Sequence, residues 1–434
     1  MTSSQPCRIH VIGAGLAGSA VAMLLAKAGA NVTLYDAGTS FGSRWTRRVD
    51  PDWKTPLSSE PDIFYDPDQR LSVFFAQWSD MPDDLITPAH VMVESDEDTW
   101  HVLKDGLATG LISSCTNWAE RLDLAVRLWA LRYADPDQGV KITEAATPVS
   151  LLGPLADFLL VTSLQRCSAA LLGKIIMPRW RDLIIKSREP VFSAMNADAM
   201  HRFALPCLKT HFIEMGGVIV ENARLDDIDS TADHATDLLF GETQIILDPA
   251  DIVIVALPPT DLYAAIPDLG IAPAPARRRA FVFKINDPAT HPAGWLVDDD
   301  LIGSVCHSGK TLHVTLACDL VIADTIPENH LARTVWQQAI SLINPEAAEQ
   351  PCPDYRFVIQ DMAFPEFTPG MAALRPKMVS PWRNLFLCGD VFASDMAPGP
   401  AAAIASAQQV CTTVLHHTAI NAAATRRSSA KSTL

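Results

Sequence analysis

The stretch RIHVIGAGLAGSAVAMLLA, residues 8–26, decides the fold of the N-terminal region. Its first apolar residues are typical of a buried parallel strand. Gly13, Gly15 and Gly18 follow with the G-x-G-x-x-G spacing of a dinucleotide-binding turn. In such a turn the first glycine makes the bend, the second admits a pyrophosphate, and the third lets the next helix pack on the sheet. We therefore expect the backbone from Gly13 to Gly18, including Ala14, Leu16 and Ala17, to bind phosphate at a helix N-terminus.

A second strand, residues 31–35, ends at the acidic residue Asp36. The small and aliphatic residues 20–28 predict the helix before it, and Gly29 stands where a C-terminal glycine is expected. A carboxylate in this place binds ribose hydroxyls and disfavours a 2′-phosphate. A secretory signal peptide fits the three closely spaced glycines poorly, whereas a βαβ unit without a ligand stays open as an alternative.

Composition narrows the class of protein. The chain has 434 residues, 48% of them hydrophobic, so it can bury a large core. Its formal net charge of −16 argues against a nucleic-acid partner. The nine cysteines contain no C-x-x-C pair, so we predict no metal site and expect a cytoplasmic location. No apolar run reaches the length that spans a bilayer.

The middle of the chain contains several predicted helices and strands. Residues 118–131 have the apolar spacing of an amphipathic helix, and residues 149–176 are apolar enough for one long buried helix. Residues 200–215 predict another helix, and residues 218–220 and 223–228 predict strands. Further on, residues 251–257 read as an interior parallel strand, residues 280–320 as an antiparallel sheet, and residues 331–343 as a helix.

A second nucleotide-type motif lies near the C-terminus. The strand 384–388 ends in Gly389 and Asp390, and a helix of small residues, 400–409, follows. Because this motif is so far from the first one, we expect an α/β fold whose nucleotide domain is discontinuous. We assign residues 1–75, 208–260 and 375–424 to that domain. Residues 76–207 and 261–374 then form an inserted α+β substrate domain, and residues 425–434 a disordered tail.

Several motifs together resemble the flavin-containing amine oxidase and phytoene desaturase superfamily. They are the glycine turn with Asp36, the Gly42-x-Arg44 element, the Ala256-x-Pro258 strand end and the terminal run 384–390. Within the superfamily the chain is most similar to the squalene-associated branch, the hydroxysqualene dehydroxylases, over nearly its full length. It departs from the family pattern at Ser43 and between residues 391 and 407, around the expected flavin ring.

The resemblance implies a Rossmann-type FAD-binding domain, and FAD as a non-covalent cofactor. An arginine that follows a turn close to the first motif suggests a pyrophosphate contact by Arg44, the alternative being an ordinary surface arginine. The resemblance adds Leu225, Ala256 and Met396 to the cofactor-binding residues, with Gly389 and Asp390 near the pyrophosphate and ribitol.

The resemblance also implies the reaction, which is loss of the hydroxyl group of hydroxysqualene to give squalene. An electron donor for FAD, squalene-forming partner enzymes and peripheral contact with the membrane follow from it as expectations. No residue stands out as the catalytic acid. Two other interpretations stay open. One is a flavoenzyme for another substrate, such as an amine oxidase or a carotenoid desaturase, and the other is a non-catalytic FAD-binding partner.

Overall fold

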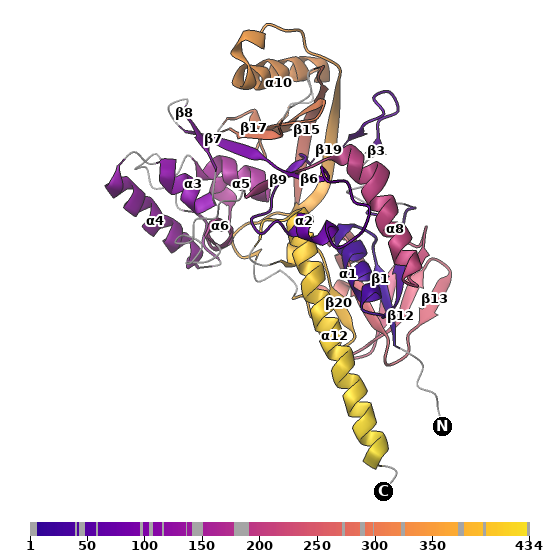
Figure 1. The fold of residues 1–434 in the computed structure, drawn as a ribbon. Helices are drawn as coiled ribbons and strands as arrows, with labels where there is room; N and C mark the ends of the chain where they lie inside the picture. The colour runs from indigo at the N-terminus through magenta and orange to yellow at the C-terminus, as the bar shows by residue number, and fades with distance from the viewer. Residues whose placement is uncertain are drawn as a thin grey trace.

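The computed structural model describes residues 7–431 except for residues 40, 43–47, 58–59, 96–98, 104–106, 115–116, 136, 141–150, 178–190, 271–273, 287–290, 298, 323–325, 372–376 and 394–395. A nucleotide-binding lobe holds both ends of the chain, and a second lobe of sheet and helices lies beyond it (Figure 1). This arrangement confirms the expected α/β class with a second, mixed part.

A five-stranded parallel sheet forms the centre of the first lobe. Its order is β10 (Val218–Val220), β2 (Asn31–Tyr35), β1 (Arg8–Ile12), β14 (Ile252–Val255) and β20 (Leu385–Leu387). Strands β14 and β20 are wholly buried, and β1 is buried from Ile9 to Ile12, as expected for the interior of a parallel sheet. Because the carboxyl ends of β1, β14 and β20 meet at one edge, motifs from the start, middle and end of the chain come together.

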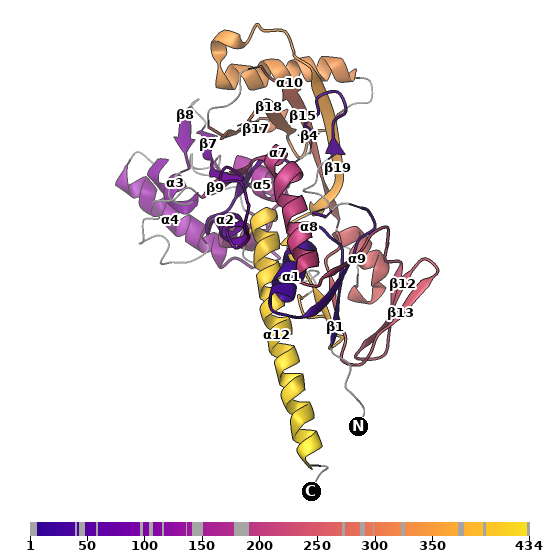
Figure 2. The same ribbon diagram turned by 45° about the vertical axis from the view of Figure 1, so that its right-hand side comes forward.

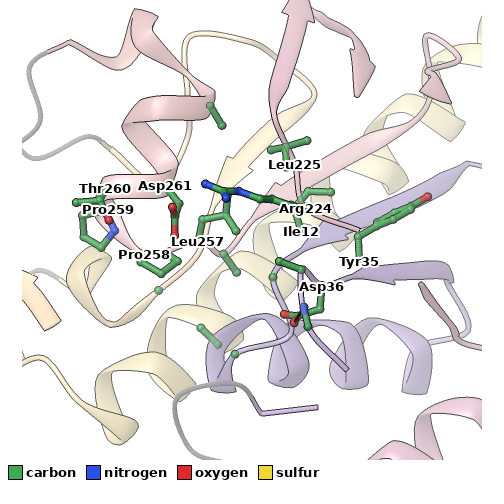
Figure 3. A pocket seen from close by; sticks show the side chains of 18 of the residues that line it. Ile12, Tyr35, Asp36, Arg224, Leu225, Leu257, Pro258, Pro259, Thr260 and Asp261 are labelled. Atoms are coloured by element: carbon green, nitrogen blue, oxygen red, sulfur yellow. Dashed lines mark hydrogen bonds between the residues drawn. The ribbon is translucent and has the colours of Figure 1, made fainter. Parts of the chain in front are cut away.

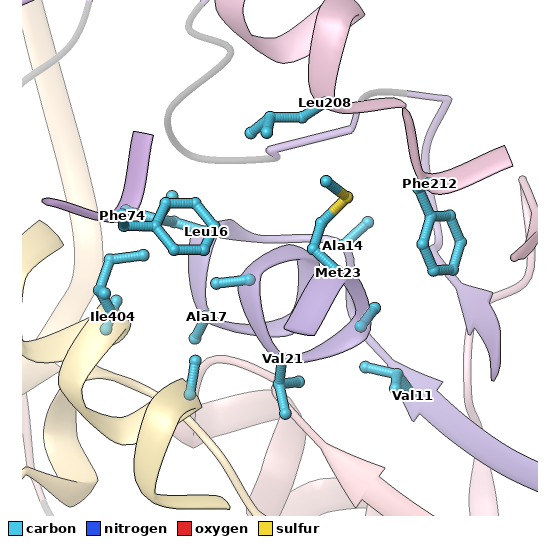
Figure 4. Close-up of a cluster of buried hydrophobic side chains, with 14 of the residues drawn as sticks. Val11, Ala14, Leu16, Ala17, Val21, Met23, Phe74, Leu208, Phe212 and Ile404 are labelled. Carbon is cyan, nitrogen blue, oxygen red and sulfur yellow. The ribbon is translucent and has the colours of Figure 1, made fainter. Parts of the chain in front are cut away.

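Three helices cover one face of this sheet: α1 (Leu16–Lys27), α8 (Leu205–Glu214) and α12 (Pro400–Lys431). Figure 4 shows their core, in which Val11, Met23, Phe212 and Ile404 converge. Figure 2 shows α12 running beside α1 and on past the sheet. This helix corrects the sequence prediction, because residues 425–431 continue it where a disordered tail was expected. Its alanine-rich sequence has a high helix propensity.

A small antiparallel sheet and α9 (Pro259–Ala265) cover the other face. Its strands are β11 (Asp227–Ser230), β12 (Ala235–Phe240) and β13 (Thr243–Ile246). The strand predicted at residues 223–228 is thus wrong in position. The N–H of Ala223 donates to the carbonyl of Asp36 (2.7 Å), so this segment is held as a loop at the end of β2.

The second lobe contains a seven-stranded sheet. Its order is β19 (Tyr355–Pro365), β15 (Pro275–Lys284), β18 (Thr311–Leu316), β17 (Ile302–Ser308), β16 (Ala293–Leu296), β7 (His90–Ser95) and β8 (Thr99–Val102). Helix α10 (Glu328–Ile343) packs on it through Trp336, which contacts Phe283. The predicted antiparallel sheet and its helix are confirmed.

The helical part of this lobe contains α3 (Leu107–Ser114), α4 (Trp118–Arg132), α5 (Leu152–Leu160) and α6 (Ala169–Ile176). The single helix predicted over residues 149–176 is wrong, because the chain turns between α5 and α6. Val161 takes a left-handed conformation (φ 51°) that ends α5. Both helices are largely buried in one hydrophobic cluster, as their composition predicts. Among the described residues, no helix is both long and apolar enough to cross a membrane.

A three-stranded sheet joins the two lobes. Its central strand is β9 (Phe192–Met195), with β5 (Ile63–Tyr65) and β6 (Ile86–Pro88) on either side. The remaining short elements are β3 (Arg48–Val49), β4 (Pro56–Leu57), α2 (Arg70–Phe75), α7 (Ala197–Ala199) and single turns at Leu164–Arg166, Met200–Ala204, Pro267–Leu269, Pro345–Ala347 and Asp390–Phe392.

Candidate nucleotide-binding site

The turn after β1 requires glycine for two different reasons. Gly13 has a φ of +97°, and a Cβ atom there would lie 2.6 Å from the carbonyl oxygen of Ala256 on the neighbouring strand end. A Cβ atom at Gly18 would lie only 1.9 Å from the carbonyl oxygen of Gly13. The turn and the first part of α1 are therefore packed as closely as a dinucleotide fingerprint demands.

The N-terminus of α1 is open to an anion. Gly15 precedes the helix without a side-chain cap, and the first turn carries no acidic residue. Its first N–H groups therefore have no capping side chain, and the helix dipole favours negative charge at this end. This arrangement suits a phosphate group.

Asp36 is hydrogen-bonded to the glycine turn. Its Oδ2 accepts a hydrogen bond from the N–H of Ala14 (2.6 Å), and its Oδ1 accepts one from the N–H of Gly38 (2.8 Å). A carboxylate has about four acceptor positions, so both oxygens can still accept from ribose hydroxyls. The side chain is half-buried and lines the cavity described below.

The second motif reaches the same edge of the sheet from β20. The N–H of Gly389 donates to the hydroxyl oxygen of Ser406 (3.1 Å) on α12, which fixes the strand end to the helix. Asp390 is buried, and its Oδ1 accepts a hydrogen bond from the N–H of Val391 (3.0 Å). A carboxylate is thereby positioned beside the start of a helix, as the sequence predicts.

A cavity of about 830 Å³ connects the two motifs. This volume lies within the range of small-molecule and cofactor sites. Nine of the predicted binding residues line it together: Gly13, Gly15, Leu16, Ala17, Asp36, Leu225, Ala256, Gly389 and Asp390. Of the other predicted residues, Ala14 supplies the N–H that fixes Asp36, and Gly18 packs α1 against the turn.

The last two predicted residues are Met396 and Arg44. Met396 is not among the described residues that line the cavity, and its N–H donates to the carbonyl of Ala393 (3.3 Å). Arg44 lies outside the described residues. The segment that leads to it begins close by, because the N–H of Gly42 donates to the carbonyl of Ala14 (2.6 Å).

Sequence reasoning missed Arg224, Asp261 and Gln360, which are among the polar residues that line the cavity. The side chain of Arg224 extends across the cavity mouth towards Asp261 (Figure 3). A guanidinium group there can pair with a phosphate or stack on a base. The only signal in the sequence is that Arg224 adjoins Leu225, whereas Gln360 comes from a distant strand, β19, with no motif to mark it.

A second, much smaller cavity of about 30 Å³ lies beside the start of α12. It is lined by Glu60, Pro61, Ile63, Phe64, Tyr65, Phe158, Leu159, Arg278 and the segment 397–400. Glu60 and Arg278 are both buried, and their charges attract one another. Burial lowers the pKa of Arg278, while the carboxylates of Glu60 and Asp157 act to raise it. No group of three His, Cys, Asp or Glu side chains that would hold a metal is present among the described residues.

Comparison with known proteins agrees with this geometry. Residues 11–78 match the model of the NAD(P)-binding Rossmann-like domain. The chain is 26% identical to the hydroxysqualene dehydroxylase of Sinorhizobium fredii, over 89% of this chain and 93% of the relative. It is 24% identical to the hydroxysqualene dehydroxylase of Rhodopseudomonas palustris, over 88% and 92% of the two chains. The chain thus resembles these proteins along most of its length.

Solved structures share the fold. An oxidoreductase from Methanosarcina mazei superposes with a TM-score of 0.65 at 15% identity, covering 93% of this chain and 99% of that one. Cyclohexylamine oxidase from Brevibacterium oxydans superposes with a TM-score of 0.63 at 14% identity, covering 94% and 98%. These likenesses establish the two-lobed fold.

Proposed function

We propose that this chain is an FAD-dependent oxidoreductase that removes the hydroxyl group of hydroxysqualene to give squalene. The observation that carries the proposal is the similarity to hydroxysqualene dehydroxylases over about nine tenths of the chain. The junction of two nucleotide-type motifs at one cavity supports it independently.

The residues present fit FAD. The turn at Gly13 and Gly18 leaves no room for side chains, and the uncapped start of α1 suits the pyrophosphate. Asp36 has acceptor positions for the adenosine ribose, and Asp390 can accept from the ribitol. Bound FAD, once reduced, would supply the hydride that replaces the hydroxyl group.

The chain's own task is to bind the substrate and keep water out. Removing an allylic hydroxyl develops positive charge on carbon, which water would capture. The apolar side chains around the small cavity, such as Phe64, Phe158 and Leu159, provide a dry environment for that step. Electrons must also enter, so we propose an external electron donor for the flavin, and squalene-forming enzymes as partners.

We also propose a cytoplasmic enzyme in peripheral contact with the membrane, since its substrate is a lipid. The candidate contact surface is the outer face of α4, where Trp118, Leu122 and Val126 are exposed, together with Tyr133 directly after the helix. These residues recur at a spacing that keeps them on one side of a helix.

The test is to incubate the reduced protein with hydroxysqualene and to extract the lipid. Squalene formed in step with flavin reoxidation supports the proposal. Reoxidation by oxygen alone contradicts it. Oxidised protein that accepts electrons from an added amine would favour an amine oxidase, the activity named for the cyclohexylamine oxidase of the same fold. Purified protein with no flavin spectrum would contradict both.

A further inference from the structure

We propose that Glu60 and Arg278 form a subsite that binds the hydroxyl group of an apolar alcohol. This inference rests on the proposed function, because it names the residues that recognise the polar end of that substrate. It concerns binding and orientation of the oxygen, and it assigns no proton transfer to either residue.

The first argument is the cost of burying this pair. Glu60 is only 5% exposed and Arg278 only 8% exposed. Buried charges are expensive, and a well-packed apolar pair would be at least as stable in most folds. The guanidinium of Arg278 is also held in place by a hydrogen bond, since its Nη2 donates to the carbonyl of Phe158 (2.9 Å). A rigidly held, buried guanidinium that shares one cavity with a buried carboxylate is better explained by recognition than by stability.

The second argument is the size of the cavity. Its volume of about 30 Å³ is enough for one water molecule or one hydroxyl group, and too small for a hydrocarbon chain. Apart from Glu60, Arg278 and the phenol of Tyr65, its side chains are aliphatic, proline or aromatic. The cavity thus presents three polar side chains among otherwise apolar ones.

The third argument is position. The segment 397–400 that lines the small cavity leads directly into α12, and Ala403, one turn further on, lines the large cavity. The first turn of α12 therefore borders both cavities. An oxygen held by Glu60 and Arg278 would therefore lie on the same side of the start of α12 as one wall of the nucleotide cavity.

The consequence is a preference for alcohol over hydrocarbon. A site built to hydrogen-bond a hydroxyl rejects the analogue that lacks it far more strongly than an apolar pocket could, because its buried polar groups are left unpaired. Such a subsite would hold an alcohol substrate and release a hydrocarbon product.

The experiment measures binding to the FAD-loaded protein, followed by the change in flavin absorbance. The probes are farnesol, an isoprenoid alcohol, and the hydrocarbon of the same length without the hydroxyl group. We expect the wild-type protein to prefer the alcohol by about 100-fold or more. Because Glu60→Leu alone would remove one of the two carboxylates that offset the buried charge of Arg278, and so threaten folding, the test variant combines it with Arg278→Met. That double variant should bind both probes equally.

The matched control removes an exposed pair of the same type. Asp198 and Arg202 lie 2.7 Å apart on the surface, so Asp198→Asn with Arg202→Met changes charge as the test variant does and should keep the preference. Retention of the preference in the test variant, or its absence in the wild type, overturns the subsite. If the wild type prefers the alcohol but does not convert hydroxysqualene, the subsite stands and the proposed reaction fails.

Discussion

The N–H of Ala14 donates a hydrogen bond of 2.6 Å to the carboxylate of Asp36, so the glycine turn and the end of β2 form one unit. We expect Asp36→Ala to weaken FAD binding by about 1–3 kcal/mol, because it removes a charge-assisted contact to the ribose and the support of the turn. Titration of the apoprotein with FAD measures this. Asp229→Ala, which removes an exposed carboxylate on β11, is the control and should bind FAD normally. Unchanged affinity in Asp36→Ala would refute the ribose assignment.

The close contact at Gly18 gives a prediction on stability. Gly18→Ala places a Cβ atom 1.9 Å from the carbonyl oxygen of Gly13. Neither this carbonyl nor the helix backbone that would carry the Cβ atom can move freely. We expect a loss of about 2 kcal/mol or more in the free energy of unfolding, together with loss of FAD binding. Denaturant unfolding of the apoprotein measures the first effect separately from the second.

The control for this substitution is Gly139→Ala, where the nearest atom to a new Cβ is 3.6 Å away. That distance is an ordinary van der Waals contact, so the variant should unfold like the wild type. Equal stability of the two variants would show that the turn relaxes around the alanine.

The sequence predicted those parts of the fold whose signals are local. The strand, the three glycines and Asp36 lie within one short stretch, and the parallel strand 252–255 is a continuous apolar run. The break between α5 and α6 was missed, because Val161 in a left-handed conformation leaves no mark in the hydrophobic pattern. The helix predicted over residues 400–409 continues to Lys431 as α12, and its polar end, residues 425–431, was expected to be disordered.

The residues that line the two cavities were also predicted only where the signal in the sequence is local. Residues within the two motifs were predicted, since the turn chemistry dictates their identity. Arg224 and Glu60 were missed because they come from irregular segments, and Arg278 because it lies within a strand of the second lobe. Only the tertiary arrangement brings Glu60 and Arg278 to one cavity.

The ion pair between Arg8 and Asp251 should make stability depend on pH. Asp251 is buried and accepts hydrogen bonds from the N–H of Arg8 (3.0 Å), its Nε (3.0 Å) and its Nη2 (2.5 Å). Burial would raise the pKa of Asp251, but these bonds and one from the N–H of Asp248 outweigh it, so the pKa lies below its ordinary value of 3.8. The stabilisation is therefore complete above that value and is lost as the pH falls through the lowered pKa.

We expect Asp251→Asn to lower the free energy of unfolding by about 2 kcal/mol at neutral pH. The difference from the wild type should shrink as the pH falls below 3.8. Urea unfolding of both proteins across this range is the measurement. A difference that stays constant with pH would mean that the ionised form of Asp251 adds nothing. Burial lowers the pKa of the neighbouring His10 while Asp251 acts to raise it, so Asp251→Asn also shifts the titration of His10.

The outer face of α4 gives the last prediction, which concerns the membrane. Trp118 is 76% exposed, and Leu122, Val126 and Tyr133 are exposed on the same side, while Leu124 and Leu128 on the other side are buried. Helix α4 also lies at the outer edge of the helical part (Figure 1). A helix with this pattern can lie in the interface of a bilayer. The net charge of −16 opposes attraction to anionic lipids, so the contact should rest on apolar burial.

We therefore expect the protein to float with liposomes to the same extent at low and high salt. Trp118→Ser combined with Leu122→Ser should abolish flotation, because it removes two of the apolar groups that would enter the interface. Ile246→Ser is the control, since Ile246 is 72% exposed on β13, in the other lobe, and should not affect binding. Two results would rule out this surface. One is wild-type protein that stays in the soluble fraction at every salt concentration, and the other is an α4 variant that still floats.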